Sequence, residues 1–137
     1  KLYWSLLACL LTGTAFGQEM AKGTVYIDGN ANGRFDKKET GIAGVSVSNG
    51  REVVQTDKNG KYEIPVQNDN IIFVIKPSGY ELPLDADNHP KFYYIHKPNG
   101  SPELKYPGVT ATGELPKSID FALKAIPLRK WSFSRMG

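Results

Sequence analysis

The sequence predicts an all-β fold, a single seven-stranded sandwich. Short runs rich in β-branched and aromatic residues recur along the chain, turn residues separate them, and helical periodicity is nearly absent. This spacing is typical of two packed sheets. The seven runs cover residues 24–27, 45–48, 52–56, 61–66, 71–76, 92–96 and 118–123.

Strong turn signals join the second, third and fourth runs. Asn49 and Gly50 predict a two-residue hairpin turn between the second and third runs. Residues 57–60, Asp-Lys-Asn-Gly, predict the next turn, after which Tyr62 and Ile64 alternate toward one face. We therefore expect a series of hairpins.

The second half of the chain is less regular. Seven prolines fall between residues 76 and 118, and they exclude long regular elements there. Between residues 76 and 118, the run at residues 92–96 is the one expected strand.

Length and charge limit the possible functions. A chain of 137 residues with 40% hydrophobic and 23% charged residues predicts one small globular domain. The net charge of +3 is scattered, without a dense basic run in the body of the chain. We therefore expect no nucleic-acid partner.

Residues 1–17 have the pattern of a secretory signal peptide. Lys1 precedes a short apolar stretch, and Ala15, Phe16 and Gly17 form a cleavage pattern ahead of Gln18. The stretch is too short to span a bilayer, so we expect no transmembrane helix. The prediction is an exported protein, periplasmic or extracellular, whose sequence starts a few residues late because a starting methionine is missing.

Cys9, the single cysteine, offers an alternative anchor. Residues 6–9 are similar to the box at which bacterial lipoproteins are acylated. More apolar residues follow Cys9, which favours its removal with the signal peptide. The exported domain would then lack disulfides and would gain stability from a bound metal ion.

The region after the first run has the spacing of a calcium loop. Residues 28–39 place oxygen-bearing side chains at the first, third, fifth, ninth and twelfth positions, with Gly33 at the sixth, where such loops turn sharply. The seventh position contributes a backbone carbonyl, so the side chain of Arg34 is free. The predicted ligands are Asp28, Asn30, Asn32, Arg34 through its carbonyl, Asp36 directly or through a water, and Glu39 in bidentate mode.

Two interpretations of this loop remain open. Asn, Asp and Gly also suit an ordinary polar turn, which needs no metal. The flanking runs have strand character, so a bound Ca²⁺ would tie together a strand connection instead of an EF-hand helix pair. Its role would be structural.

Further segments carry a family resemblance. The loop, residues 41–47 (Gly-Ile-Ala-Gly-Val-Ser-Val) and residues 56–64 (Thr-Asp-Lys-Asn-Gly-Lys-Tyr-Glu-Ile) resemble the B-type repeats of Gram-positive surface adhesins and the carboxypeptidase-regulatory or transthyretin-like (prealbumin) sandwiches. With residues 92–102, 105–108 and 115–121, the chain from residue 23 to 123 resembles the N-terminal β-sandwich domain of exported calcineurin-like metallophosphoesterases of Bacteroidetes.

The resemblance implies a metal-dependent phosphoesterase (hydrolase) domain as the partner, which would hold two metals that activate a hydroxide. None of its companion motifs is present, so we expect no catalytic residue and no two-metal site in this chain. Asp87, Asn88 and His89 are similar to one such motif, but we interpret them as a solvated turn. His96 is interpreted as structural or as a surface residue.

Residues 125–137 follow the predicted sandwich domain, residues 18–124. We interpret them as a linker stub or an aberrant tail of a fragment. Three basic residues alternate with two aromatic ones in this tail, so contact with an anionic surface is the alternative. They are Arg129, Lys130, Trp131, Phe133 and Arg135.

The preferred hypothesis is a non-catalytic, calcium-stabilised accessory domain of an exported phosphoesterase. A competing hypothesis is an adhesion or glycan-binding module that uses Tyr93 and Tyr94. A passive spacer between membrane and enzyme is the third.

Overall fold

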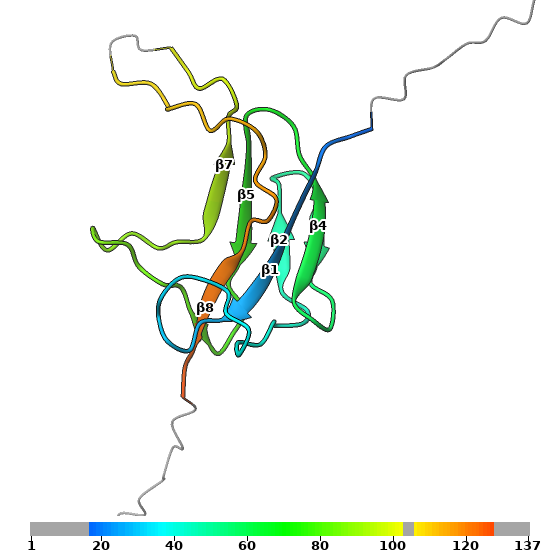
Figure 1. Cartoon of the computed structure of the whole chain (residues 1–137), viewed down its shortest axis with the longest axis vertical. Helices are drawn as coiled ribbons and strands as arrows, with labels where there is room; N and C mark the ends of the chain where they lie inside the picture. The colour runs from blue at the N-terminus through cyan, green and yellow to red at the C-terminus, as the bar shows by residue number, and fades with distance from the viewer. Residues whose placement is uncertain (1–16, 103–105, 128–137) are drawn as a thin grey trace, which may run out of the picture.

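The computed structural model describes residues 17–102 and 106–127 and shows two packed four-stranded sheets (Figure 1). The strand orders are β4-β1-β8-β6 and β3-β2-β5-β7. The predicted all-β sandwich is therefore confirmed. The strands are β1 (Met20–Ile27), β2 (Ser46–Ser48), β3 (Val53–Gln55), β4 (Lys61–Pro65), β5 (Asn70–Ile75), β6 (Tyr80–Glu81), β7 (Tyr93–His96) and β8 (Phe121–Ala125).

The first and last strands meet in the middle of the first sheet. β1 pairs in parallel with β8, from Val25 beside Phe121 to Ile27 beside Leu123, and antiparallel with β4. Pro65 ends β4 at the sheet edge, where a missing N–H costs no ladder bond. The last strand of the domain is therefore hydrogen-bonded directly to the first.

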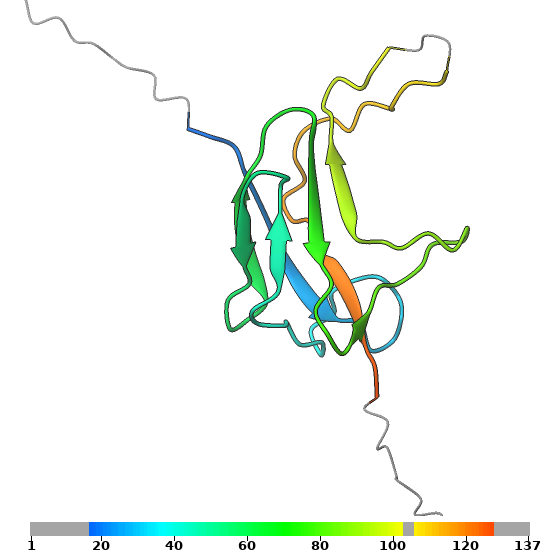
Figure 2. The same cartoon turned by 180° about the vertical axis from the view of Figure 1, so that it is seen from behind.

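The second sheet is antiparallel throughout. β2 pairs with β3 and β5, and β5 pairs with β7 (Figure 2). Alternate side chains of both sheets point inward, as the period-two pattern predicts. The buried core consists of Ala21, Val25, Ile42, Val45, Val47, Tyr62, Ile64, Val66, Ile72, Val74, Ile119, Phe121 and Leu123.

The number of strands and the hairpin series differ from the prediction. The structure adds β6, a two-residue strand between Gly79 and Pro83, which is too short to leave a periodic pattern. Residues 57–60 do form a turn, but β3 and β4 lie in different sheets. The turn therefore crosses the sandwich, because β1 offers β4 a longer partner than β3 does.

The turn between β2 and β3 is longer than two residues, since Ser48 faces Val53 in the register. Asn49 is 9% exposed, and its Oδ1 accepts the N–H of Glu52 at 2.8 Å and that of Arg51. Its Nδ2 donates to the carbonyl of Pro65 at 2.8 Å. The predicted hairpin is confirmed, while the two-residue turn was wrong because the Asn49 side chain replaces a backbone partner.

Two glycines allow the chain to return to β1 after the 28–39 loop. A Cβ on Gly41 would overlap the carbonyl oxygen of Asn59, and one on Gly60 would meet the carbonyl oxygen of Val25. Gly60 also has a φ of 77°. The loop is thereby closed by backbone packing that tolerates no side chain at either glycine.

Several predictions concern residues that lie largely outside the described ones. The predicted signal peptide is described only at Gly17, and most of residues 125–137 falls beyond the described part. Within residues 17–102 and 106–127, no helix has the length and apolar character needed to cross a bilayer.

Candidate metal-binding loop and adjoining cleft

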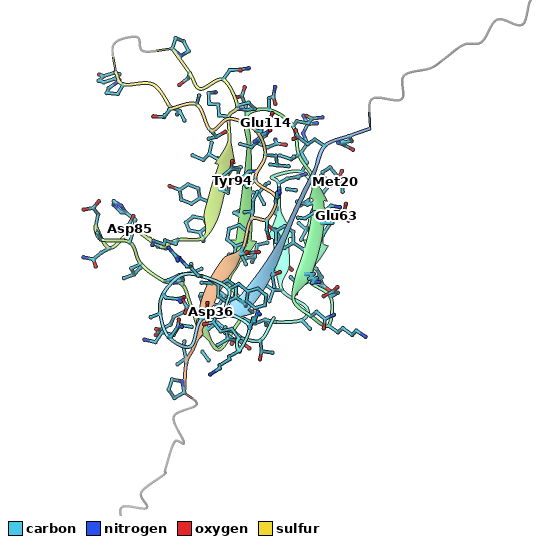
Figure 3. The ribbon with its side chains drawn as sticks, in the orientation of Figure 1. Met20, Asp36, Glu63, Asp85, Tyr94 and Glu114 are labelled. Atoms are coloured by element: carbon cyan, nitrogen blue, oxygen red, sulfur yellow. The ribbon has the colours of Figure 1, made fainter. Side chains whose placement is uncertain are left out.

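The 28–39 loop begins and ends on the core of the first sheet. Asp28 follows β1 and is 9% exposed, and its N–H donates to the carbonyl of Leu123 at 2.9 Å. At the other end, the N–H of Ile27 donates to the carbonyl of Thr40 at 2.9 Å. The two ends are therefore fixed, and residues between them project as a loop (Figure 3, where Asp36 is labelled).

The Asp28 carboxylate organises the first half of the loop. Its Oδ2 accepts the N–H of Gly33 at 2.8 Å, and its Oδ1 accepts that of Asn32 at 3.3 Å. Gly33 has a φ of 70° and Ala31 one of 58°. The chain therefore bends sharply at the sixth loop position, as the calcium-loop spacing predicts.

Glu39 organises the second half. Its Oε1 accepts the N–H of Gly29 at 3.1 Å, and its Oε2 accepts that of Asp36 at 3.0 Å. One carboxylate thus reaches both the start and the ninth position of the loop. A residue at the twelfth position must extend back across the loop in this way to act as a bidentate ligand.

Asp36 receives the two asparagine side chains. Its Oδ2 accepts from Nδ2 of Asn30 at 2.9 Å and from Nδ2 of Asn32 at 2.8 Å. These two hydrogen bonds lower the pKa of the half-buried Asp36 side chain. The two asparagine donors therefore favour the negatively charged form of Asp36, which is the form that would bind a cation.

The donor set fits a hard cation in its chemistry. Residues 28–39 carry three carboxylates and two amide oxygens, the oxygen ligands that Ca²⁺ prefers. The amide oxygens of Asn30 and Asn32 accept the N–H groups of Asn32 and Arg34, at 3.2 and 2.9 Å. An ion would require the loop to contract and its two amides to turn their oxygens toward it.

The loop carboxylates also act on a core tyrosine. Tyr26 is 1% exposed and its ring lies 5.0 Å from that of Phe35, which packs the loop on the sheet. Burial, and then the charges of Asp28 and Glu39, raise the pKa of Tyr26 to about 12. Negative charge thus concentrates at this end of β1.

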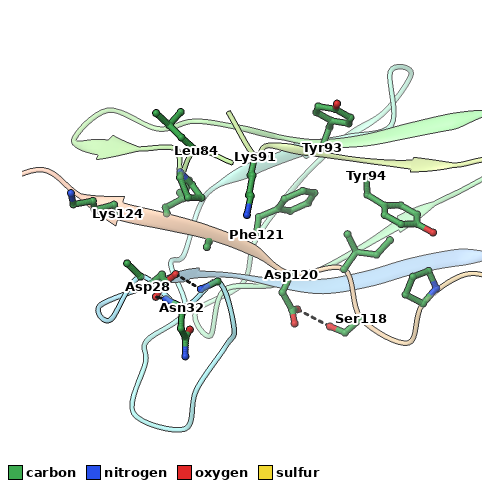
Figure 4. Close-up of a pocket in the computed structure, with 17 residues that line it drawn as sticks. Asp28, Asn32, Leu84, Lys91, Tyr93, Tyr94, Ser118, Asp120, Phe121 and Lys124 are labelled. Atoms are coloured by element: carbon green, nitrogen blue, oxygen red, sulfur yellow. Dashed lines mark hydrogen bonds between the residues drawn. The ribbon is translucent and has the colours of Figure 1, made fainter. Parts of the chain in front are cut away.

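A cleft of about 550 Å³ adjoins the loop (Figure 4). Phe121 of β8 and Tyr94 of β7 both line it, from strands of the two facing sheets. Leu84 and Tyr93 at its rim are 55% and 52% exposed. Asp28, at the base of the loop, also lines it, so the loop forms one wall.

A second acidic turn lies on the far side of this cleft. Asp85, Asp87 and His89 each bring one ligand atom within 4.8 Å of the others, a spacing that the carboxylates of the 28–39 loop do not reach. Asp85 Oδ1 accepts the N–H groups of Asp87 and His89, at 2.9 and 2.8 Å. Residues 87–89 are exposed. The predicted solvated turn is confirmed as a turn.

The comparisons with known proteins decide the family. Residues 29–106, more than half of the chain, match the family model described as the N terminal of calcineurin-like phosphoesterase. The chain belongs to this family. It is an N-terminal accessory domain of the calcineurin-like phosphoesterase type, and the match includes most of the loop, the second sheet and the acidic turn.

A curated relative matches a shorter part. The chain is 35% identical over 68 residues to Colossin-A of Dictyostelium discoideum. The match covers 47% of this chain and 1% of Colossin-A. The chain therefore spans a very small part of this relative's length.

Sequence reasoning missed the cleft and the surroundings of His96. The cleft is lined by segments from four parts of the chain, so no local sequence pattern predicts it. His96 belongs to the interior, with 1% exposure. Its place at the end of a short aromatic strand, whose side chains become more buried from Tyr93 to His96, is a signal that could have indicated this.

Proposed function

We propose that this domain is a non-catalytic, calcium-stabilised accessory domain of an exported calcineurin-like phosphoesterase. The family match supports its place at the N-terminus of such an enzyme. The phosphoesterase catalytic domain is the proposed partner. Export follows from the signal-peptide pattern, and a bacterial (Bacteroidetes) origin and kinship with adhesin and transthyretin-like sandwiches stay predictions of the sequence.

The arrangement of Asp28 and Glu39 carries the calcium proposal. Asp28 is held at the end of β1, and Glu39 reaches back across the loop to Gly29 and Asp36. The proposed ligands are these two carboxylates, Asp36, the amide oxygens of Asn30 and Asn32, and the carbonyl of Arg34. An ion bound there would join the end of β1 to the segment that leads into Gly41.

A calcium titration tests the proposal. The chain from Gln18 to Gly137, which contains every described strand, is stripped with a chelator, and its thermal unfolding is followed as Ca²⁺ is added. At a hundred times the dissociation constant, binding stabilises by about 2.7 kcal/mol. For a domain of this size we expect the midpoint to rise by about 10 °C or more.

Charge-neutral variants locate the effect. Asp28→Asn with Glu39→Gln keeps the side-chain shapes, and we expect it to abolish the rise. Asp85→Asn with Asp87→Asn changes an equal number of carboxylates in the other acidic turn and should leave it intact. A rise that persists in the first pair, or no rise at millimolar Ca²⁺, would reject the calcium site while leaving the family assignment in place.

The cleft favours one further function, a binding module for an apolar or sugar ligand. Leu84 and Tyr93 are more than half exposed at its rim, and Phe121 supplies an apolar floor. A glycan array or an apolar dye, compared between the unaltered chain and Tyr93→Ala, tests this function. Equal binding by both proteins would exclude it.

A further inference from the structure

His96 is a buried imidazole without a hydrogen-bond partner. It is 1% exposed at the end of β7, and among the described residues no group bonds to its Nδ1 or its Nε2. A neutral imidazole has one N–H to donate and one lone pair to share. Leaving both unmatched in the interior is costly, so the site calls for a ligand or a water.

The ring adjoins an open hollow that also contains two carboxylates. The hollow has a volume of about 550 Å³ and lies at the end of the sandwich where β1 begins and β7 ends. Figure 3 labels Glu114 there, above β7. The lining residues are Glu19, His96, Pro98, Asn99, Gly113, Glu114 and Leu115.

The distance between His96 and Glu19 suits two ligands of one metal. Nε2 of His96 lies 3.7 Å from Oε2 of Glu19, which is too long for a hydrogen bond. Two ligands at the corners of a zinc tetrahedron, each about 2.0 to 2.2 Å from the ion, lie about 3.3 to 3.6 Å apart. A small closing movement of the Glu19 side chain, which is 52% exposed, would complete this geometry.

The backbone holds both residues in place from opposite sheets. The carbonyl of Glu19 accepts the N–H of Val66 at 2.9 Å, beside the first sheet. The carbonyl of His96 accepts the N–H of Asp69 at 2.8 Å in the second sheet, and its ring stacks on Tyr94 with centroids 6.5 Å apart. A shared ion would therefore cross-link the two sheets at this end.

We propose that His96, Glu19 and Glu114 form a binding site for a divalent transition metal, with Zn²⁺ as the best fit. One imidazole and two carboxylates suit zinc, and a water would take the fourth position. Glu114 lines the same hollow, but the three ligand atoms do not all lie within 4.8 Å of one another, so its exposed side chain must turn toward the ion to bind it. The site is separate from the 28–39 loop, whose donors are all oxygens.

The chain has two histidines, which gives a matched test. The protein from Gln18 to Gly137, free of any histidine tag, is titrated with Zn²⁺ by calorimetry and with Co²⁺ by visible absorption. We expect one site, at least about tenfold weaker in His96→Gln and unchanged in His89→Gln. His89 belongs to the other ligand cluster, with Asp85 and Asp87.

Variants of exposed residues keep the test valid where His96→Gln fails to fold. Glu19→Gln and Glu114→Gln should each weaken Co²⁺ binding, while Asp28→Asn with Glu39→Gln should not. Binding that is lost in His89→Gln but kept in His96→Gln would place the metal at the exposed turn and overturn the proposal. Absence of binding at millimolar Zn²⁺ would also overturn it and would leave His96 satisfied by water.

Discussion

Two loops of this domain begin with the same turn and end differently. Asp28 accepts the N–H of Asn32, four residues on, and Asp85 accepts that of His89. The residue before each donor has a positive φ, 58° at Ala31 and 63° at Asn88. Asp28, however, is nearly buried, whereas the Asp85 side chain is 38% exposed.

The difference lies in what the chain does after the turn. The first loop continues to Asp36 and Glu39 and rejoins the core at Gly41. The second closes at once through a bridge between Leu84 and Pro90. An aspartate followed by small or polar residues is therefore enough to form the turn. To hold several carboxylates close together, as in the 28–39 loop, the loop must also be attached to the core at both ends.

The largest expected effect comes from removing that anchorage. Gly41→Ala places a Cβ against the carbonyl oxygen of Asn59, so we expect a loss of at least about 3 kcal/mol in the free energy of unfolding. Gly29→Ala, where a Cβ meets nothing within 4 Å, is the control. Chemical denaturation measures both, and equal losses would show that the Gly41 crossing does not anchor the loop.

A smaller effect separates the two aspartates themselves. With chelator present, Asp28→Ala leaves the N–H of Gly33 without an acceptor and that of Asn32 with Asn30 Oδ1 alone, in a partly buried site, at a cost of about 2 kcal/mol. Asp85→Ala frees N–H groups that water can reach, so its cost should stay below about 1 kcal/mol. Similar unfolding free energies for the two variants would contradict the contrast in burial.

A stabilising substitution tests the left-handed backbone conformation that the two turns have in common. Ala31→Gly removes the strain of a left-handed alanine and should raise the free energy of unfolding by up to about 1 kcal/mol. Asn88→Gly should change it little, because asparagine tolerates this conformation. Thermal unfolding compares the variants, and destabilisation by Ala31→Gly would argue against the positive φ.

The smallest effect depends on pH. Hydrogen bonds from Asn30 and Asn32 lower the pKa of Asp36 below its value in the unfolded chain, so its contribution is present above that value, near pH 4. The contribution is lost as the pH falls through the folded value. Asp36→Asn should therefore reduce the difference in stability between pH 7 and pH 3. Asp87→Asn is the control, and an unchanged difference in Asp36→Asn would count against these bonds.

The sequence identified local features well. The alternation of apolar and charged residues placed Tyr62 and Ile64 in the core, because period-two burial follows from the geometry of a strand. Acidic and amide residues at alternate positions predicted the sharp bend at Gly33. The prolines between residues 76 and 118 correctly predicted few strands in that segment, although the short strand β6 was not predicted.

Pairing between distant segments was beyond the sequence. Nothing near residues 57–60 shows that β4 pairs with β1 and leaves β3 in the other sheet. The same holds for His96 and Glu19, which are 77 positions apart and meet because the sandwich brings the start of β1 beside the end of β7. The sequence by itself determined the strands, the turns and the spacing of the loop donors, since these depend on neighbouring residues. Only the tertiary structure decided which sheet each strand joins and which distant polar side chains meet, because those outcomes depend on packing of the whole core.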